Sequence, residues 1–351
     1  MGAFTDTARH PSRAGLEVGP PAGAKLRGAM AEPLYLAADI GGTKTSCTVA
    51  TEAGEILAAA RAPTPVAEGP EACLGIIGRL LRQAAGEAGV PPEGCRAIGA
   101  AIGGPLDSRR GIIYSPPNLP NWEAVPLKDH LEAEFGLPAH TENDANAGAL
   151  AEARFGAGRG AQNVVYLTLG TGIGGGIIAD GRLYRGTTDD AGEIGHTTVL
   201  PGGPPCGCGK RGCLEALVAG PAIGRRAREK ARAQPDSLLW EGAGGDESAI
   251  GGETALHAAQ RGDAAALEVW AETAEYLGLG IANLVQVLNP QVVALGTIAI
   301  AAGDLLLEPV RAVVRREAWP RAVEAVRIVP AELGERVGDL AALCCALNEG
   351  R

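Results

Sequence analysis

An aspartate between two asparagines is the first feature of this sequence that could do chemistry. Asp144 lies in the run Thr141-Glu142-Asn143-Asp144-Ala145-Asn146, with a short apolar strand before it and an Ala-rich helix after it. In α/β proteins ligands bind where strands end and helices begin, because backbone N–H groups and side chains converge there. Asp is also a good helix N-cap. The pattern therefore leaves two interpretations open, a ligand-binding carboxylate and a cap.

A histidine and three cysteines form the strongest local motif. His196 is followed by Cys206, Cys208 and Cys213, with glycines between the cysteines. This is the Cys₃His ligand set of a closed, tetrahedral structural zinc site, and the glycines allow the tight turns that such ligation needs. The other cysteines lie in apolar surroundings and are expected to be small core residues. They are Cys47, Cys73, Cys95, Cys344 and Cys345.

Two strand–turn–strand units carry glycine-rich turns. A strand over 34–40, with Asp39 near its end, leads into Gly41-Gly42-Thr43-Lys44. A strand over 163–169 leads into the glycine-rich run from Gly170 to Gly176, which is followed by a strand through Ala179. Such turns let backbone N–H groups approach an anion closely. A plain hairpin turn would not explain the acid at the end of a buried strand. The pair predicts a duplicated architecture in which each half offers a phosphate-binding turn.

Two further segments are candidates that also have ordinary explanations. Asn118 lies in the Pro-rich stretch 115–122, which is rigid enough to hold its amide against a hydroxyl group, although a solvated loop Asn is commoner. Gly296 and Thr297 follow a buried strand over 291–295. They would lie beside a nucleotide base or its phosphates, although a helix-entry turn explains them nearly as well.

Apolar periodicity places these residues in an α/β fold. Besides the strands already named, we expect strands over 46–51, 55–61, 96–102, 137–142 and 326–329. We expect helices over 70–86, 125–135, 144–155, 217–232, 254–288, 302–316 and 337–347. The expected organisation is a disordered tail over 1–32, a small α/β domain over 33–142 and a large α/β domain over 143–336. The helix 337–347 packs back on the first domain, and Met30 is the expected native start.

Composition excludes several classes of function. The chain has 351 residues, of which 46% are hydrophobic and 21% charged, which fits a globular protein of two domains. A net charge of -10 and 3% aromatics argue against nucleic-acid binding. Neither a membrane helix nor a signal peptide is visible. We therefore expect a cytoplasmic protein.

Taken together, these motifs resemble the ROK family (repressor, open reading frame, kinase) in order and spacing from about residue 33 onward. Within that family the chain is most similar to the bacterial ATP-dependent glucokinases. The motifs are Asp39-Ile40-Gly41-Gly42-Thr43-Lys44, Glu142-Asn143-Asp144-Ala145-Asn146-Ala147, Leu169-Gly170-Thr171-Gly172-Ile173-Gly174-Gly175-Gly176, Glu193-Ile194-Gly195-His196 and the segment from Cys206 to Glu215.

The resemblance implies an actin-like ATPase (ribonuclease H-like) fold, with two α/β domains around a cleft. It implies a glycolytic enzyme that transfers the γ-phosphoryl group of ATP, with Mg²⁺, to the 6-hydroxyl of glucose. It also implies a structural Zn²⁺ and a homodimer or homotetramer.

By position, the resemblance also assigns roles to single residues. Asp144 would be the general base. The sugar would be bound by Asn118, Asn143, Asp144, Glu193, His196 and Glu215. ATP and Mg²⁺ would be bound by Asp39, Gly41, Gly42, Thr43, Lys44, Gly170, Thr171, Gly172 and Gly296. The zinc ligands would be His196, Cys206, Cys208 and Cys213.

Some features depart from the family or leave alternatives open. Many relatives have three glycines where this chain has Gly296-Thr297-Ile298, and Asp339 stands where a small or apolar residue is usual. The sugar could be fructose, mannose or an N-acetylhexosamine such as N-acetylmannosamine, and the donor could be another nucleotide or polyphosphate. A sugar-responsive repressor is disfavoured, because no helix-turn-helix pattern precedes the first strand.

Overall fold

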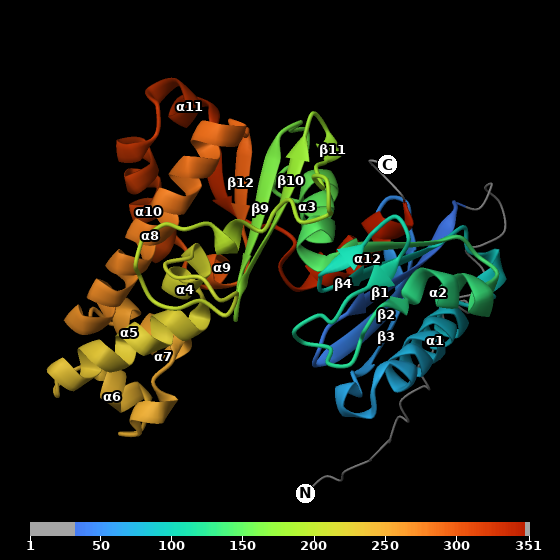
Figure 1. The fold of residues 1–351 in the computed structure, drawn as a ribbon, viewed down its shortest axis with the longest axis horizontal. Helices are drawn as coiled ribbons and strands as arrows, with labels where there is room; N and C mark the ends of the chain where they lie inside the picture. Colours follow the sequence, from blue (N-terminus) through green and yellow to red (C-terminus); the bar gives the residue numbers. More distant parts are fainter. Residues whose placement is uncertain (1–31, 348–351) are drawn as a thin grey trace, which may run out of the picture. The chain divides into compact units, whose positions relative to one another are not determined.

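The computed structural model describes residues 32–347, so Met30 and nearly all of the expected tail lie outside the described residues. Two mixed five-stranded sheets form the framework of the described part (Figure 1). The first contains β1 (Leu34–Ile40), β2 (Lys44–Thr51), β3 (Ile56–Pro63), β4 (Ile98–Ile102) and β8 (Ala139–Asn143). The second contains β9 (Val164–Leu169), β10 (Ile173–Ala179), β11 (Arg182–Leu183), β12 (Val292–Leu295) and β13 (Arg327–Pro330). A small sheet contains β5 (Leu106–Asp107), β6 (Ile112–Ile113) and β7 (Val125–Pro126).

The two large sheets have the same topology. Their strand orders are β3-β2-β1-β4-β8 and β11-β10-β9-β12-β13. In each sheet an antiparallel meander comes first, and two parallel strands are then added on the other side of its first strand. This repetition confirms the duplicated architecture that the two glycine-rich hairpins predict.

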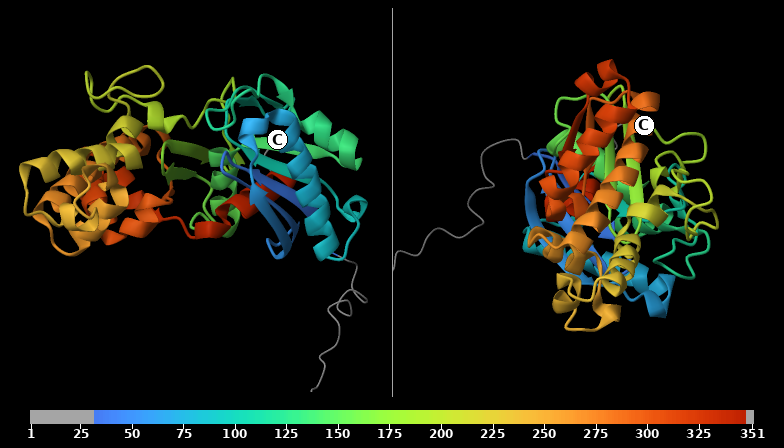
Figure 2. Two further views of the ribbon diagram at one scale, coloured as in Figure 1. Left: turned by 90° about the horizontal axis from the view of Figure 1, so that it is seen from below. Right: turned by 90° about the vertical axis from the view of Figure 1, so that its left-hand side faces the viewer.

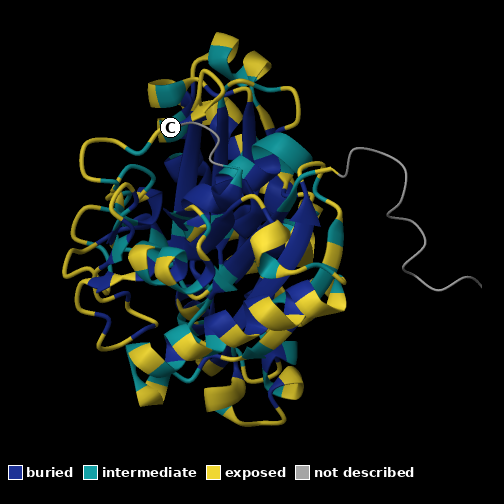
Figure 3. Ribbon diagram, turned by 90° about the vertical axis from the view of Figure 1, so that its right-hand side faces the viewer, coloured by how far each residue is buried: buried dark blue, intermediate teal, exposed yellow. Residues whose placement is uncertain are grey.

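Helices cover both faces of the first sheet. On one face lie α1 (Pro70–Glu87) and α2 (Leu127–Phe135), and α1 buries Ile77, Leu80 and Leu81 at helical spacing. On the other face α12 (Val337–Ala346) packs against β1 and β4. The central strands β1 and β4 are therefore buried on both sides, and the edge strand β3 is mostly not buried. The outer faces of the helices are exposed (Figure 3).

The second sheet is also covered on both faces. On one face lies α3 (Asp144–Phe155), which also packs against α12. The other face carries a helical layer in which α8 and α10 lie side by side (Figure 2). That layer consists of α4 (Leu214–Val218), α5 (Gly220–Ala233), α6 (Leu238–Gly242), α7 (Gly252–Gln260), α8 (Ala264–Leu288), α9 (Ile298–Ala302), α10 (Asp304–Glu317) and α11 (Pro320–Ala325).

The helix expected over 254–288 is in fact two helices, α7 and α8. Gly262 breaks the helical path with a φ of 84°. Asp263 then caps α8 by accepting a hydrogen bond from the N–H of Ala266 at 2.8 Å. Over residues 32–347, no helix combines the length and the apolar character that crossing a lipid bilayer requires.

Candidate active site

Asp144 is the first residue of α3 and directly follows β8. The N-cap of this helix is Asn143, whose Oδ1 accepts hydrogen bonds from the N–H of Ala145 at 2.9 Å and of Asn146 at 3.1 Å. The Oδ1 of Asp144 accepts a hydrogen bond from the N–H of Ala145 at 2.8 Å. The capping role therefore belongs to Asn143, and Asp144 remains exposed.

Asp144 opens into a cavity of about 260 Å³ that it shares with Asp39, Tyr166 and Thr168. Protein surrounds the rest of the carboxyl group closely. This desolvation raises the pKa of Asp144 above its ordinary value, although the N–H of Ala145 lowers it. A raised pKa makes the carboxylate a better proton acceptor than an ordinary surface acid.

Asp39, near the end of β1, lines the same cavity. Burial and then the negative charges of Asp339 and Asp144 raise its pKa to about 6, while Lys44 and Arg61 lower it. Like charges that share a cavity repel each other, and carboxylate oxygens are ligands for Mg²⁺. A divalent cation bound by Asp39 would relieve this repulsion, so the residues present fit such an ion.

The structure explains Asp339, which the sequence alone does not. Its buried carboxylate accepts a hydrogen bond from Oγ of Ser46 at 2.6 Å and forms an ion pair with Arg61 at 2.6 Å. Asp339 therefore ties α12 to β2 and β3. The preceding residue, Gly338, is also required, since an added Cβ would lie 2.1 Å from Oδ2 of Asp39.

The turn between β1 and β2 is built by close backbone contacts. The N–H of Gly41 donates to the carbonyl oxygen of Lys44 at 3.1 Å. A Cβ on Gly42 would lie 2.5 Å from the carbonyl oxygen of Asn118. The contact with Gly42 places the Asn118 loop beside the turn, and the buried side chain of Trp122 anchors that loop. Lys44 is exposed, as is the adjacent Thr43.

The turn between β9 and β10 comprises Gly170, Thr171 and Gly172. The N–H of Gly170 donates to the carbonyl oxygen of Gly172 at 2.9 Å, and the carbonyl oxygen of Gly170 accepts from the N–H of Gly220 at 2.8 Å. Gly170 and Thr171 line a second cavity, described below. Two residues of the turn that the sequence predicts to bind phosphate therefore face this cavity.

The glycines that follow have a packing role instead. Gly174, Gly175 and Gly176 lie within β10 and not in the turn. A Cβ on Gly176 would lie 2.6 Å from Cβ of Ala149 in α3, and a Cβ on Gly175 would lie 2.8 Å from the carbonyl oxygen of Gly192. These glycines let α3 and the 189–196 loop approach opposite faces of the strand. The glycine-rich turn is therefore shorter than the sequence run indicates.

Glu193, His196 and Glu215 come together in space. Nε2 of His196 lies 3.8 Å from a carboxylate oxygen of Glu193, and its Nδ1 lies 3.9 Å from one of Glu215. The other oxygen of Glu215 accepts a hydrogen bond from the N–H of Ile173 at 2.9 Å. Burial raises the pKa of Glu193, partly offset by His196. Glu215 thus links this group to the start of β10.

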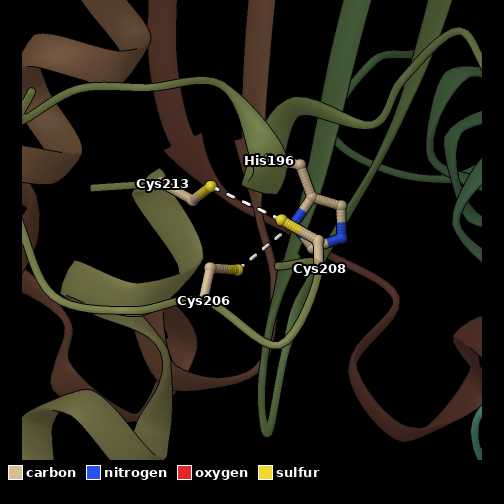
Figure 4. Close-up of side chains that lie close together, drawn as sticks. All are labelled: His196, Cys206, Cys208 and Cys213. Carbon is tan, nitrogen blue, oxygen red and sulfur yellow. Dashed lines mark hydrogen bonds between the residues drawn. The ribbon is translucent and has the colours of Figure 1, made fainter. Parts of the chain in front are cut away.

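His196 also belongs to the cysteine cluster (Figure 4). One ligand atom from each of His196, Cys206, Cys208 and Cys213 lies within 4.8 Å of all the others. The Sγ atoms of Cys208 and Cys213 are 3.7 Å apart, and Sγ of Cys206 is 3.6 Å from Nδ1 of His196. Nζ of Lys210 donates to the carbonyl oxygen of His196 at 2.8 Å. The four side chains could hold a metal ion.

The second cavity, of about 560 Å³, lies beside the β9–β10 turn and is largely apolar. Trp270 lines it, and the indole N–H of this buried residue has no hydrogen-bond partner among residues 32–347. Thr297 lines the cavity, whereas Gly296 packs beneath it, with its Cβ position 3.0 Å from the hydroxyl oxygen of Tyr166. The sequence names both Gly296 and Thr297 as candidates and the resemblance assigns the role to Gly296, but of the two only Thr297 lines the cavity.

Two functional candidates had no sequence signal that could have revealed them. Trp270 lies in an ordinary apolar helix pattern. Arg185 donates from Nε to the buried carboxylate of Glu142 at 2.6 Å and lines a polar cavity near Asp189. Because Glu142 and Arg185 lie 43 residues apart, only the fold shows that they meet.

Comparison with known proteins places this arrangement in context. The model of the ROK family matches residues 35–349. The glucokinase of Halalkalibacterium halodurans is 39% identical over 315 residues, which cover 88% of this chain and 93% of that protein. The ROK hexokinase structure from Thermus thermophilus has a TM-score of 0.77 and 38% identity, covering 90% of this chain and 98% of that one.

A further structure was crystallised with ligands. The ROK family glucokinase from Streptomyces griseus, in complex with glucose and AMPPNP, has a TM-score of 0.75 and 36% identity, covering 90% of this chain and 99% of that one. Xylose repressors are more distant relatives.

Proposed function

This chain belongs to the ROK family, and we propose that it is a glucokinase, which transfers the γ-phosphoryl group of ATP to the 6-hydroxyl of glucose. Its fold is the actin-like ATPase (ribonuclease H-like) fold expected from the sequence. The observation that carries the proposal is the exposed carboxylate of Asp144, which directly follows β8. This carboxylate shares a cavity with Asp39 of β1. The glucose- and AMPPNP-bound relative supports the choice of substrates.

Asp144 accepts the proton of the attacking hydroxyl group. Phosphoryl transfer depends on positioning and charge neutralisation more than on covalent chemistry. A carboxylate within hydrogen-bonding reach of the hydroxyl contributes about 10²–10⁴-fold to the rate. The raised pKa of Asp144 supports this role.

The sugar is held by residues from three parts of the chain. Asn143 offers only its Nδ2 group, because Oδ1 caps α3. His196 has Nδ1 beside Cys206 and Nε2 toward Glu193, so one ring nitrogen is available to a metal and the other to the sugar. The remaining hydroxyl groups meet Asn118, Glu193 and Glu215.

The nucleotide lies along the two glycine-rich turns. The cavity of about 560 Å³ beside Thr171 is large enough for the adenine base, and Gly296 supports its wall. The phosphates meet Gly41, Gly42, Thr43 and Lys44 from one turn and Gly170, Thr171 and Gly172 from the other. Asp39 would hold Mg²⁺, which supplies charge neutralisation when bound.

The cysteine cluster would hold a structural zinc ion through His196, Cys206, Cys208 and Cys213. Zinc bound tetrahedrally, with bonds of about 2.3 Å to sulfur and 2.0 Å to nitrogen, brings its ligand atoms to about 3.5–3.8 Å from one another. The distances of 3.7 Å between two sulfurs and 3.6 Å between sulfur and nitrogen agree with this set. With these four side chains as its ligands, the ion would have no open coordination position, so it would order the segment that carries His196 and Glu215 and would take no part in the chemistry.

The decisive experiment is Asp144→Asn. We expect kcat to fall by about 10²–10⁴-fold, because the base is lost while the shape of the site is kept. Glucose binding, measured by calorimetry, is expected to persist within about threefold. A variant that turns over at a near-normal rate would refute the assignment of the base.

A panel of sugars with ATP, and of donors with glucose, tests substrate identity. Fructose, mannose or N-acetylmannosamine phosphorylated more efficiently than glucose would move the assignment to another sugar kinase. Efficient turnover with polyphosphate would widen the donor class. A gel-shift assay with promoter DNA tests the repressor alternative, for which we expect no binding.

The organisation of the molecule is also part of the proposal. We place the small domain at 33–142, the large domain at 143–336, and the helix 337–347 with the small domain. We expect a cytoplasmic homodimer or homotetramer, which size-exclusion chromatography with light scattering would test.

A further inference from the structure

Thr297 has a backbone conformation that is unfavourable for its residue type. It follows β12 and precedes α9 with a φ of 49° and a ψ of -100°. A β-branched residue at positive φ is a genuine outlier, whereas glycine adopts such angles freely. Thr297 is exposed, so burial of its side chain in a core does not compensate for the strain. Strain of this kind persists mainly at functional sites.

The hydroxyl of Thr297 lies at the junction of the two cavities of the site. Its Oγ1 is 3.2 Å from Oγ1 of Thr168 in β9. Thr297 lines the cavity beside Thr171, and Thr168 lines the cavity that contains Asp39 and Asp144. The two hydroxyls therefore connect the proposed base pocket with the proposed transfer site.

We propose that Thr297 is a donor-positioning residue whose hydroxyl, together with that of Thr168, binds the phosphate chain of the nucleotide. This inference rests on the proposed function. A nucleotide that has its base in the larger cavity and its terminal phosphate near Asp144 must pass its phosphates by this pair. Hydroxyl groups donate readily to phosphate oxygens. The strained backbone directs the Thr297 hydroxyl toward the junction, which a relaxed turn would not ensure.

Two substitutions at this position separate strain from hydrogen bonding. Thr297→Gly removes both the strain and the hydroxyl. We expect Tm of the ligand-free protein to rise by about 2–4 °C, while KM for ATP rises about tenfold through loss of a charge-assisted hydrogen bond. Thr297→Val keeps the branched side chain at the same φ, so the same loss of ATP affinity is expected without the gain in Tm. KM for glucose should stay within about twofold in both variants.

Conservative and matched variants serve as controls. Thr297→Ser retains the hydroxyl and should keep KM for ATP within about twofold of the original protein. Asp180 also has a positive φ, of 50°, but lies in the β10–β11 turn away from both cavities. Asp180→Gly is therefore expected to leave KM for ATP unchanged. Thr168→Val should raise KM for ATP. The double variant Thr168→Val with Thr297→Gly should raise KM for ATP by a smaller factor than the product of the two single factors.

The length of the phosphate chain identifies the part of the nucleotide that is bound. Calorimetry would compare the affinity of the original protein and of Thr297→Gly for adenosine, AMP, ADP and ATP. We expect the two proteins to bind adenosine equally well, and the loss of affinity in the variant to increase from AMP through ADP to ATP. An equal loss for adenosine and ATP would place the contact at the nucleoside and overturn the proposal, as would unchanged ATP affinity in both Thr297→Gly and Thr297→Val. Failure of the original protein to bind ATP or phosphorylate any hexose would instead refute the proposed function.

Discussion

The two glycine-rich hairpins have the same topology but present different chemical groups. Asp39 and Thr168 are each the second-last residue of the strand that enters the turn, in β1 and β9. Both line the cavity that contains Asp144. The first hairpin presents a carboxylate, which favours a cation, and the second presents a hydroxyl, which can donate to an anion. The repeated sheet thus determines where a group lies, and the residue type determines what it binds.

The turns also differ in their surroundings. The space beside Gly42 is filled by the backbone of Asn118, whereas a Cβ on Gly170 would meet no heavy atom within 4 Å. The first turn is therefore packed against the proposed sugar loop, while the second has open space at Gly170. The second turn approaches the proposed sugar ligands at its other end, where a Cβ on Gly172 would lie 2.7 Å from Oε2 of Glu215.

Removing the acid of the first hairpin should have the largest effect. For Asp39→Asn we expect kcat to fall by about 10²–10³-fold, because charge that stabilises the transferring phosphoryl group is lost with the cation. At the equivalent place in the second hairpin, Thr168→Val should change kcat by less than about tenfold. Steady-state kinetics at saturating Mg²⁺ would measure both. Equal losses in kcat would show that the two positions are not chemically distinct.

The same Asp39→Asn variant tests how the stability of the folded protein depends on pH. The folded-state pKa of Asp39 is about 6, against an ordinary value of 3.8. Between these values the folded state binds more protons than the unfolded state, so the free energy of unfolding falls as pH rises through this window. Without Mg²⁺, Asp39→Asn should therefore have a higher Tm than the original protein above pH 6, and the difference should shrink toward pH 4. A difference independent of pH would contradict this.

Loss of the metal ion from the cysteine cluster should weaken binding of the sugar more than binding of the nucleotide. Glu215 connects the cluster to the start of β10, so Cys208→Ser or chelation should raise KM for glucose by about 10–100-fold. KM for ATP should change by less than about threefold. Metal content can be measured by mass spectrometry. Cys95→Ala, a cysteine outside the cluster, is the control, and full glucose affinity in a metal-free protein would contradict the structural role.

Adding a methyl group to each turn tests their surroundings directly. Gly42→Ala places a Cβ 2.5 Å from the carbonyl oxygen of Asn118, which forces the loop to shift and should raise KM for glucose by about tenfold. Gly170→Ala should leave both Tm and KM for glucose nearly unchanged, because its Cβ position is open. Comparable thermal destabilisation by both substitutions would show that the turns are packed alike.

The smallest effect is expected in the network below the first hairpin. Ser46→Ala removes a hydrogen bond to the buried carboxylate of Asp339, which should lower the free energy of unfolding by about 1.5–3 kcal/mol with little change in kcat. Ser248 donates a similar hydrogen bond to Asp246 on the surface. Ser248→Ala is therefore the matched control, with an expected change within about 0.5 kcal/mol. Denaturant unfolding would measure both.

Local patterns predicted much of the candidate site. The strand before Asp144, the helix after it and the two hairpins are encoded by short periodic stretches, and the ligands of the cysteine cluster lie close together in the chain. Such features depend on residues that are close together in the chain, so they can be predicted without knowledge of the tertiary structure. The glycine run after residue 172 was the exception, because glycine serves a turn and a close strand contact equally well.

Contacts between distant segments could not be predicted in this way. Ser46 and Asp339 meet although they are 293 residues apart, and Thr168 meets Thr297 across 129 residues. No local pattern encodes which side chains of a strand will face a helix or a loop that lies far away in the chain. The positive φ of Thr297 could not be predicted either, because glycine is the residue type that normally indicates such a backbone angle.

The sequence by itself determined the family, the repeated hairpins, the acid at the start of α3 and the metal-ligand set, because each is a short-range pattern of residue types. Only the tertiary structure decided that Asn143 is the cap, that Asp339 joins three elements beneath Asp39, and that Thr297 lines the larger cavity. The physical reason is that charge, burial and backbone strain depend on groups brought together by packing, and packing joins residues that the chain keeps far apart.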